Sequence, residues 1–226
     1  MQQQAGAEDV ENHFVRGTET RQMLLALLAD EEGWRFEKSR GGASVSSRPD
    51  ETGFWLRIEV DFEEENDYDQ LLDVLHTSLE TRQKEWHELL IPGGRVQELD
   101  DSRRICYFAY RSPWPMSDRD CLYAAQANLE HVQTDGAAEF KVFYWTIVDD
   151  AVEPPRNGRV RIDFQAAHWV RRAVHGQGKC RYIYIQRSDA KVHLPDFLLK
   201  SIQVDILLGE AEGLRKAIST SSVPPK

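Results

Sequence analysis

The middle of this 226-residue chain consists of strand-like segments joined by short connections. Five apolar runs follow one another: RRICYFAYR (103–111), DCLYAAQANLEHV (120–132), EFKVFYWTIVDD (139–150), RVRIDFQAAHWVRRAV (159–174) and KCRYIYIQR (179–187). The later connections are the polar or Pro/Gly-rich stretches QTDGAA, AVEPPRNG and HGQG. Parallel neighbours would need crossovers of a dozen or more residues, so these short connections predict an antiparallel sheet.

The first part of the chain adds strands and helices to this sheet. A helix is predicted over 18–33, followed by the strands WRFEKS, ASVSSRP and GFWLRIEVDF, the last alternating from Phe54 to Phe62. Residues 67–90 change to a helical period and predict two short helices, with a capping box at Thr77 and Glu80. The segment IPGG (91–94) is predicted to end this insert. A sheet of about nine strands must curl to cover its apolar faces.

The C-terminal segment 193–218 has the composition to close such a sheet. It predicts the longest helix, roughly 35 Å at 1.5 Å per residue, with Pro195 near its first turn. Its broad apolar face is wide enough to lie across a concave sheet. The expected fold is α+β, with a curved antiparallel sheet wrapped around this helix, an N-terminal helix and a two-helix insert.

The domain organisation follows from the same segments. Residues 1–17 are polar with few apolar anchors and are expected to be disordered or loosely attached. Residues 18–218 are expected to form one domain, and residues 219–226 a flexible tail.

Composition narrows the class of function. The net charge is −10, which argues against binding nucleic acid. No window approaches the about 20 apolar residues of a membrane helix, and the N-terminus lacks the features of a secretory signal. The three cysteines lie in strand-like runs without metal spacing, which predicts reduced thiols in the cytoplasm.

A basic cluster could be solvated strand edges or a docking patch for anionic lipids: Arg156, Arg159, Arg161, Arg171, Arg172, Lys179 and Arg181.

The sequence contains none of the common motifs for catalysis, metal binding or cofactor binding. The chain has no nucleophile elbow, no Walker loop and no H-E-x-x-H sequence. His168 stands out because strand alternation places it in register with Phe164 and Val170. It could be a neutral core histidine, a polar contact for a ligand in an apolar cavity, or, with Asp163, an acid/base pair.

The stretch RSPWPMSDRDCLYAA (111–125) contains two prolines around a tryptophan, then Arg119 and Asp120. Pro113, Trp114 and Pro115 predict a rigid turn between two strands. Arg119 and Asp120 open the next strand and therefore point to opposite faces. We expect a structural role for both, with Arg119 bonded to carbonyls or a carboxylate beyond its own strand.

The sequence PWPMSDRDCLY resembles a motif of the START family, the lipid-transfer domains related to the steroidogenic acute regulatory protein. Weaker similarities are TRQKEWHEL (81–89), VEPPRNGRVRI (152–162) and QRSDAKVHLPDFLLK (186–200). The resemblance implies a helix-grip fold and one lipid held in an apolar tunnel gated by the C-terminal helix. It further implies intracellular, non-vesicular lipid transfer with transient contact to membranes.

Several positions depart from the patterns of ligand-specific members. The insert of family members often runs to Trp-Asp, whereas Trp86 is followed here by His87. In phosphatidylcholine-binding members an aromatic cage holds the head group. At the matching positions this chain has Phe108, which is aromatic, and Cys121 and Gln165, which are not. Ala125 stands where sterol-handling members commonly carry an arginine. The expected ligand is therefore a lipid of the phospholipid or sterol class, without a choice between them.

We expect a cytoplasmic, monomeric lipid-binding protein without cofactor or metal. The alternatives are an enzyme on the same scaffold using His168 and Asp163, or a regulatory domain whose cavity is filled by its own side chains. The residues expected to line the cavity are Phe108, Tyr110, Trp145, Phe164, His168 and Tyr184, with Phe197, Ile202 and Ile206 on the covering helix.

Overall fold

A computed structural model describes most of the chain. The described residues are 7–51, 53–62, 67–77, 85–112, 116–130, 139–146, 158–172 and 180–219. The predicted turn residues Pro113, Trp114 and Pro115, the capping residue Glu80 and the tail beyond 219 lie outside the described residues.

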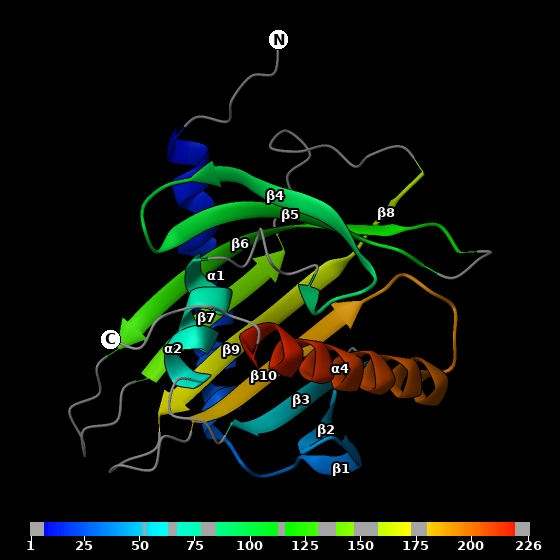
Figure 1. Ribbon diagram of the computed structural model, residues 1–226. Coiled ribbons are helices and arrows are strands. Elements are labelled where there is room, and N and C mark those ends of the chain that lie inside the picture. The colour runs from blue at the N-terminus through cyan, green and yellow to red at the C-terminus, as the bar shows by residue number, and fades with distance from the viewer. Residues whose placement is uncertain are drawn as a thin grey trace.

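One antiparallel sheet forms the centre of the molecule, as the sequence predicts (Figure 1). Its order is β1-β2-β3-β10-β9-β7-β6-β5-β4, and the short strand β8 pairs in parallel with β6. The strands are β1 (Arg35–Arg40), β2 (Ala43–Asp50), β3 (Gly53–Phe62), β4 (Leu90–Glu98), β5 (Arg103–Tyr110), β6 (Arg119–Glu130), β7 (Glu139–Thr146), β8 (Val160–Arg161), β9 (Asp163–Arg172) and β10 (Cys180–Asp189).

Both faces of this sheet are buried. Along β3, Leu56, Ile58 and Val60 enter the core beneath the C-terminal helix, whereas Trp55 enters a second core on the opposite face. The second core lies under α1 (Ala7–Ala29), which covers the back of the sheet in Figure 1. Burial on both faces explains why these strands carry apolar residues at successive positions.

The N-terminal helix is longer than the sequence predicts. It begins at Ala7 and not near Thr18, so residues 7–17 are helical where the sequence predicts a disordered or loosely attached segment. Phe14 is buried and its ring meets Trp145 edge-on, with ring centroids 5.5 Å apart. A Cβ at Gly17 would lie 2.2 Å from the Trp145 ring, so glycine permits the close approach of α1 to β7.

The described residues of the insert include the helix α2 (Asp67–Leu72), and they lead into a strand, β4, that the sequence does not predict. α2 continues into a π-helical turn, η1 (Asp73–Thr77). Most of the second predicted helix lies outside the described residues. The segment 91–94, predicted as a terminating turn, instead lies within β4, which pairs with β5 through two irregularities in register. β4 is an edge strand, where proline is tolerated.

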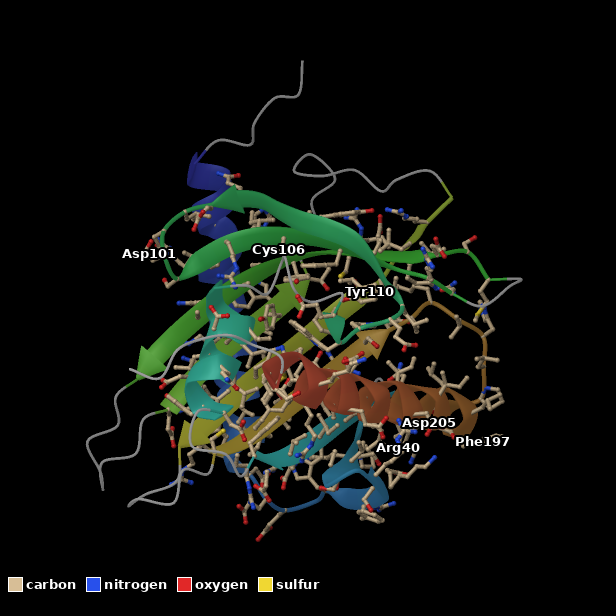
Figure 2. The ribbon with its side chains drawn as sticks, viewed as in Figure 1. Arg40, Asp101, Cys106, Tyr110, Phe197 and Asp205 are labelled. Atoms are coloured by element: carbon tan, nitrogen blue, oxygen red, sulfur yellow. The ribbon has the colours of Figure 1, made fainter. Side chains whose placement is uncertain are left out.

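The C-terminal helix α4 (Asp196–Ser219) lies across the concave face of the sheet (Figure 1). The Pro195 carbonyl accepts hydrogen bonds from the backbone N–H groups of Leu198 and Leu199, at 2.9 and 3.1 Å. One flank of the helix is held to the β1 edge by three ion pairs, Lys38–Asp205 at 2.7 Å, Arg40–Glu212 at 2.6 Å and Glu37–Lys200 at 2.7 Å. Figure 2 shows Arg40 and Asp205 on this side of α4. None of the described helices is long and apolar enough to cross a membrane.

Candidate functional site

A cavity of about 250 Å³ lies between α4 and the concave face of the sheet. Its walls come from β3, β5, β6, β7, β9, β10, the segment before β4 and one side of α4. The lining is mostly apolar or aromatic, with a few polar side chains at separate points. These lining side chains include Trp86, His87, Tyr110, Arg119, Tyr123, Tyr144, Phe164, His168, Tyr182, Tyr184, Gln186, Ser188, Ile202, Gln203, Ile206 and Glu210.

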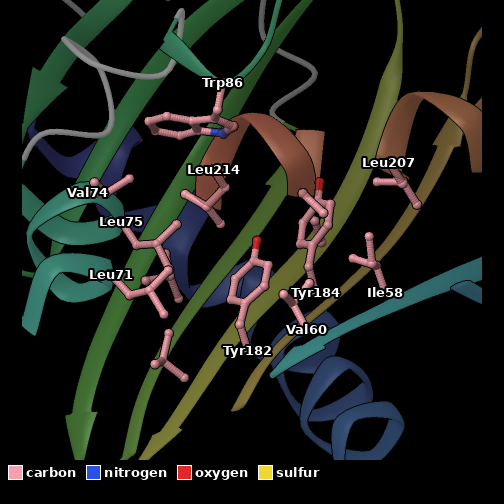
Figure 3. Packing of buried hydrophobic residues seen from close by; sticks show 14 of the residues in the cluster. Ile58, Val60, Leu71, Val74, Leu75, Trp86, Tyr182, Tyr184, Leu207 and Leu214 are labelled. Atoms are coloured by element: carbon pink, nitrogen blue, oxygen red, sulfur yellow. The ribbon is translucent and has the colours of Figure 1, made fainter. Parts of the chain in front are cut away.

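Tyrosines and one histidine form the floor of the cavity. Tyr182 and Tyr184 are alternate residues of β10, and both rings stand toward α4 (Figure 3). His168 is the register partner of Tyr184 on β9, and the two rings stack with centroids 4.3 Å apart. Burial raises the pKa of both tyrosines well above the ordinary value, so their hydroxyls remain neutral. The floor therefore offers aromatic surface and uncharged hydrogen-bonding groups.

His168 lines this cavity as a neutral residue. Its Nδ1 lies 2.7 Å from the Tyr182 hydroxyl, and burial lowers its pKa to about 3. Asp163 does not join it: this carboxylate lies on the opposite face of β9 and pairs with Lys191 at 2.7 Å. The structure thus corrects the hypothesis of a His168–Asp163 acid/base pair, because the two residues differ in strand parity.

A second histidine, His87, connects the segment before β4 to α4. Its Nε2 lies 2.9 Å from Oε1 of Glu210, and its ring packs against Tyr110 with centroids 5.1 Å apart. Burial acts to lower the pKa of His87, but the charge and hydrogen bond of Glu210 outweigh it, and the net shift is upward. The pair therefore holds α4 to the insert most strongly when His87 is protonated.

We expect this pair to make the stability of the closed protein depend on pH. A histidine whose pKa is raised on folding contributes its full stabilisation below the unfolded value of about 6.5, and the contribution is lost as the pH rises through the folded value. The free energy of unfolding of wild type should exceed that of His87→Gln at about pH 6, and the difference should shrink as the pH rises above about 6.5. Urea titrations of both proteins check this, and a difference that stays constant with pH would contradict it.

The Arg-Asp pair of the central motif lies where β6 begins. Arg119 is 8 % exposed, and its Nε donates to the Ala190 carbonyl at 3.2 Å, beyond its own strand as expected. Asp120 is fully buried on the other face, where it accepts from the Tyr107 hydroxyl at 3.0 Å and from Arg161 Nε at 2.7 Å. The two charges therefore point to opposite faces.

The structure brings six of the nine predicted binding residues onto the cavity. These are Tyr110, Phe164, His168, Tyr184, Ile202 and Ile206. Trp145 is a correction, because it faces α1 on the other side of the sheet. Phe108 is fully buried and stacks on Tyr123 without lining the cavity. Phe197 is 72 % exposed at the start of α4 (Figure 2), and it also does not line the cavity.

Several lining residues were missed by the sequence analysis. Strand alternation could have found Tyr182, which shares a face with Tyr184, and Tyr123, which shares a face with Cys121. His87 and Glu210 carry no local signal, because they meet only when the insert and α4 pack together.

The basic cluster seen in the sequence does not form a free cationic patch among its described members. Arg159 donates to the Tyr107 hydroxyl at 2.7 Å, and Arg161 pairs with Asp120. Arg171 lies 3.3 Å from Glu139, and Arg181 lies 2.8 Å from Asp61. Each of these charges has a polar or acidic partner, which favours the interpretation as strand residues over a lipid-docking patch.

A curved antiparallel sheet that closes on a long C-terminal helix, with a mostly apolar cavity between them, defines the class of helix-grip domains. The START domain family model matches residues 15–218, and the chain belongs to this family. No curated protein matches the sequence.

Solved structures share this fold at low sequence identity. Human STARD10 is 20% identical over 96% of this chain and 81% of its own, with a TM-score of 0.73. Human StAR-related lipid transfer protein 5 is 17% identical over 92% and 97%, with a TM-score of 0.77. A STAR-related lipid transfer protein from Xanthomonas axonopodis is 21% identical over 84% and 100%, with a TM-score of 0.64.

Proposed function

We propose that this protein binds one lipid in the cavity beneath α4 and carries it between membranes without vesicles. The observation that supports this most directly is the mostly apolar cavity under the C-terminal helix in a member of the START domain family. Two of the similar structures carry lipid transfer in their names. The proposal includes a monomer that works in the cytoplasm and touches membranes transiently.

The size of the cavity supports a gating role for α4. Its volume of about 250 Å³ is below the roughly 300–1,000 Å³ of sites that enclose drug-sized ligands. A membrane lipid is larger than such ligands, so uptake requires α4 or the adjoining segments to move outward. The ion pairs between α4 and the β1 edge are partly exposed, and pairs of this kind contribute little stability. These surface pairs therefore add little to the energetic cost of such movement.

The start of α4 supports contact with a membrane during this movement. Phe197, Leu198 and Ile202 are large apolar side chains exposed within two turns of the helix. Ile202 also lines the cavity, so the exposed apolar surface is continuous with the cavity wall. Exposed apolar groups of this kind are typical of surfaces that contact membranes or partners.

The small volume also favours a second candidate, a regulatory domain whose cavity is filled by its own side chains. In that case no lipid would be bound at all. The two candidates therefore differ in a direct chemical measurement.

The test is organic extraction of the purified protein followed by mass spectrometry, together with transfer between donor and acceptor vesicles. We expect stoichiometric lipid and measurable transfer. Ile206→Trp should reduce both, because the larger side chain occupies the cavity, whereas Lys216→Trp on the exposed side of α4 should retain both. Folded wild-type protein with neither bound lipid nor transfer would establish the regulatory alternative.

A further inference from the structure

Arg119 is a buried cation on the wall of the cavity. Only 8 % of it is exposed, and it lines the cavity from the first position of β6. Nε donates to the Ala190 carbonyl, and Nη1 donates to the Ser117 carbonyl and lies 3.5 Å from the Ser112 hydroxyl. Among the residues that the structure describes, no acceptor binds Nη2.

The charge of Arg119 has no carboxylate partner in the described part of the chain. Its neighbour Asp120 points to the opposite face and is engaged by Tyr107 and Arg161. The carboxylate of Glu210, which also lines the cavity, is engaged by His87. A buried arginine normally has an anionic partner, because the desolvated charge is otherwise costly. The guanidinium therefore remains able to bind an oxyanion with the fork geometry that suits phosphate and carboxylate.

Arg119 lies at the polar end of the cavity. Gln186 and Ser188 extend along β10 toward Ala190, the residue whose carbonyl Arg119 contacts. Ser188 accepts a hydrogen bond from Gln203 of α4 at 3.3 Å. Farther along α4, Leu207, Ala211 and Leu214 provide apolar wall. A bound amphiphile would thus place its head group near Arg119 and its chain along the apolar wall.

This end is also where the cavity meets the surface. Three lining residues are exposed to solvent, Leu89, Arg111 and Ile202. The Arg111 backbone N–H donates to the Leu89 carbonyl at 2.8 Å, and Tyr110, the residue before Arg111, is the register partner of Arg119. An anionic head group at Arg119 would therefore remain near water while the chain is enclosed.

We propose that Arg119 binds the phosphate or carboxylate oxyanion of a lipid head group and selects such lipids over uncharged ones. This inference rests on the proposed lipid-binding function and deepens it. The guanidinium is the anion-binding group, Ser112 and the Gln186–Ser188 edge surround the head, and the tyrosine floor and α4 enclose the chain.

The experiment compares 1-oleoyl lysophosphatidate with 1-monoolein, which share chain and glycerol and differ by the phosphate. Vesicles that contain equal amounts of both are incubated with the protein, and the bound probes are quantified by mass spectrometry. Wild type should retain lysophosphatidate in about tenfold to hundredfold preference, as expected for hydrogen bonds to a charged group. Arg119→Gln should bring the ratio close to one, and Arg119→Lys should keep part of the preference as a point charge.

The ratio of the two probes is independent of the amount of folded protein, which protects the test against loss of stability in the variants. Arg181→Gln is the matched control, because Arg181 pairs with Asp61 on the surface away from the cavity and should leave the ratio unchanged. A wild-type ratio of one, or an unchanged ratio in Arg119→Gln, would overturn the role of Arg119 while leaving lipid binding intact. Displacement of lysophosphatidate by equimolar inorganic phosphate would show a site for free anions and would also overturn it. Recovery of neither probe nor any vesicle lipid would refute the proposed function itself.

Discussion

Asp120→Ala is expected to lower the free energy of unfolding by about 3–5 kcal/mol, the range for removing one partner of a buried ion pair. Asp120 is fully buried, and it accepts hydrogen bonds from Tyr107 and Arg161. The variant leaves the largely buried guanidinium of Arg161 without this carboxylate. Asp120 and Arg161 are also register partners in the parallel pairing of β6 with β8. Urea denaturation followed by tryptophan fluorescence measures the loss.

A surface pair of similar geometry provides the control for this prediction. Asp61 and Arg181 are separated by 2.8 Å, but both side chains are more than half exposed. Asp61→Ala should cost at most about 1 kcal/mol, because exposed pairs are solvated whether or not they meet. Similar losses for Asp120→Ala and Asp61→Ala would show that burial does not determine the value of the Asp120 contact.

The antiparallel sheet and its covering helix could be predicted because each depends on local patterns. Short connections determine which strands are neighbours, and alternation determines which side chains share a face. On β9 this parity correctly placed Phe164 and His168 toward α4. The same rule separated Arg119 from Asp120, which the structure confirms.

The predictions from the sequence are wrong where the local pattern of residues is ambiguous. β7 carries Phe143, Tyr144 and Trp145 in succession, and since the sheet is covered on both faces, composition cannot assign each ring to a face. β4 was missed because IPGG has the composition of a turn, although an edge strand with irregular register accommodates it. The start of helix α1 was predicted too late because its N-terminal part packs against a residue remote in sequence, with Phe14 in contact with Trp145.

The candidate site was only partly predictable for the same reason. The apolar floor follows from strand alternation, whereas its polar groups depend on packing between distant segments. Glu210 meets His87, and Arg119 meets Ala190, only after the sheet has closed on the segment that leads into α4. The proposed role of Arg119 requires that Asp120 pairs with other residues. Strand parity predicts that the two side chains point to opposite faces, but it does not identify the partners of Asp120.

Gly213→Ala is expected to weaken the closed position of α4 and to accelerate lipid exchange. A Cβ at Gly213 would lie 2.6 Å from the Trp86 carbonyl oxygen and 2.7 Å from its Cα, so backbone and not a movable side chain would have to shift. The clash opposes the about 1 kcal/mol that alanine gains over glycine within a helix. Since overpacking typically costs about 1–3 kcal/mol, we expect a net loss of stability and a faster rate of lipid transfer between vesicles.

Gly209, one turn earlier in α4, provides the matched control for this prediction. Both glycines are helical, and they differ in what surrounds them. A Cβ at Gly209 would meet only the end of the Arg40 side chain, at 3.8 Å. Gly209→Ala should therefore stabilise the protein by up to about 1 kcal/mol through helix propensity alone and leave the transfer rate near that of wild type. Opposite signs for the two variants in urea titrations, with acceleration only in Gly213→Ala, would identify the contact between α4 and Trp86 as the one that controls opening. If Gly213→Ala stabilised the protein as Gly209→Ala does, this contact would be loose enough to admit a methyl group. Other contacts along α4 would then have to hold the helix closed over the cavity.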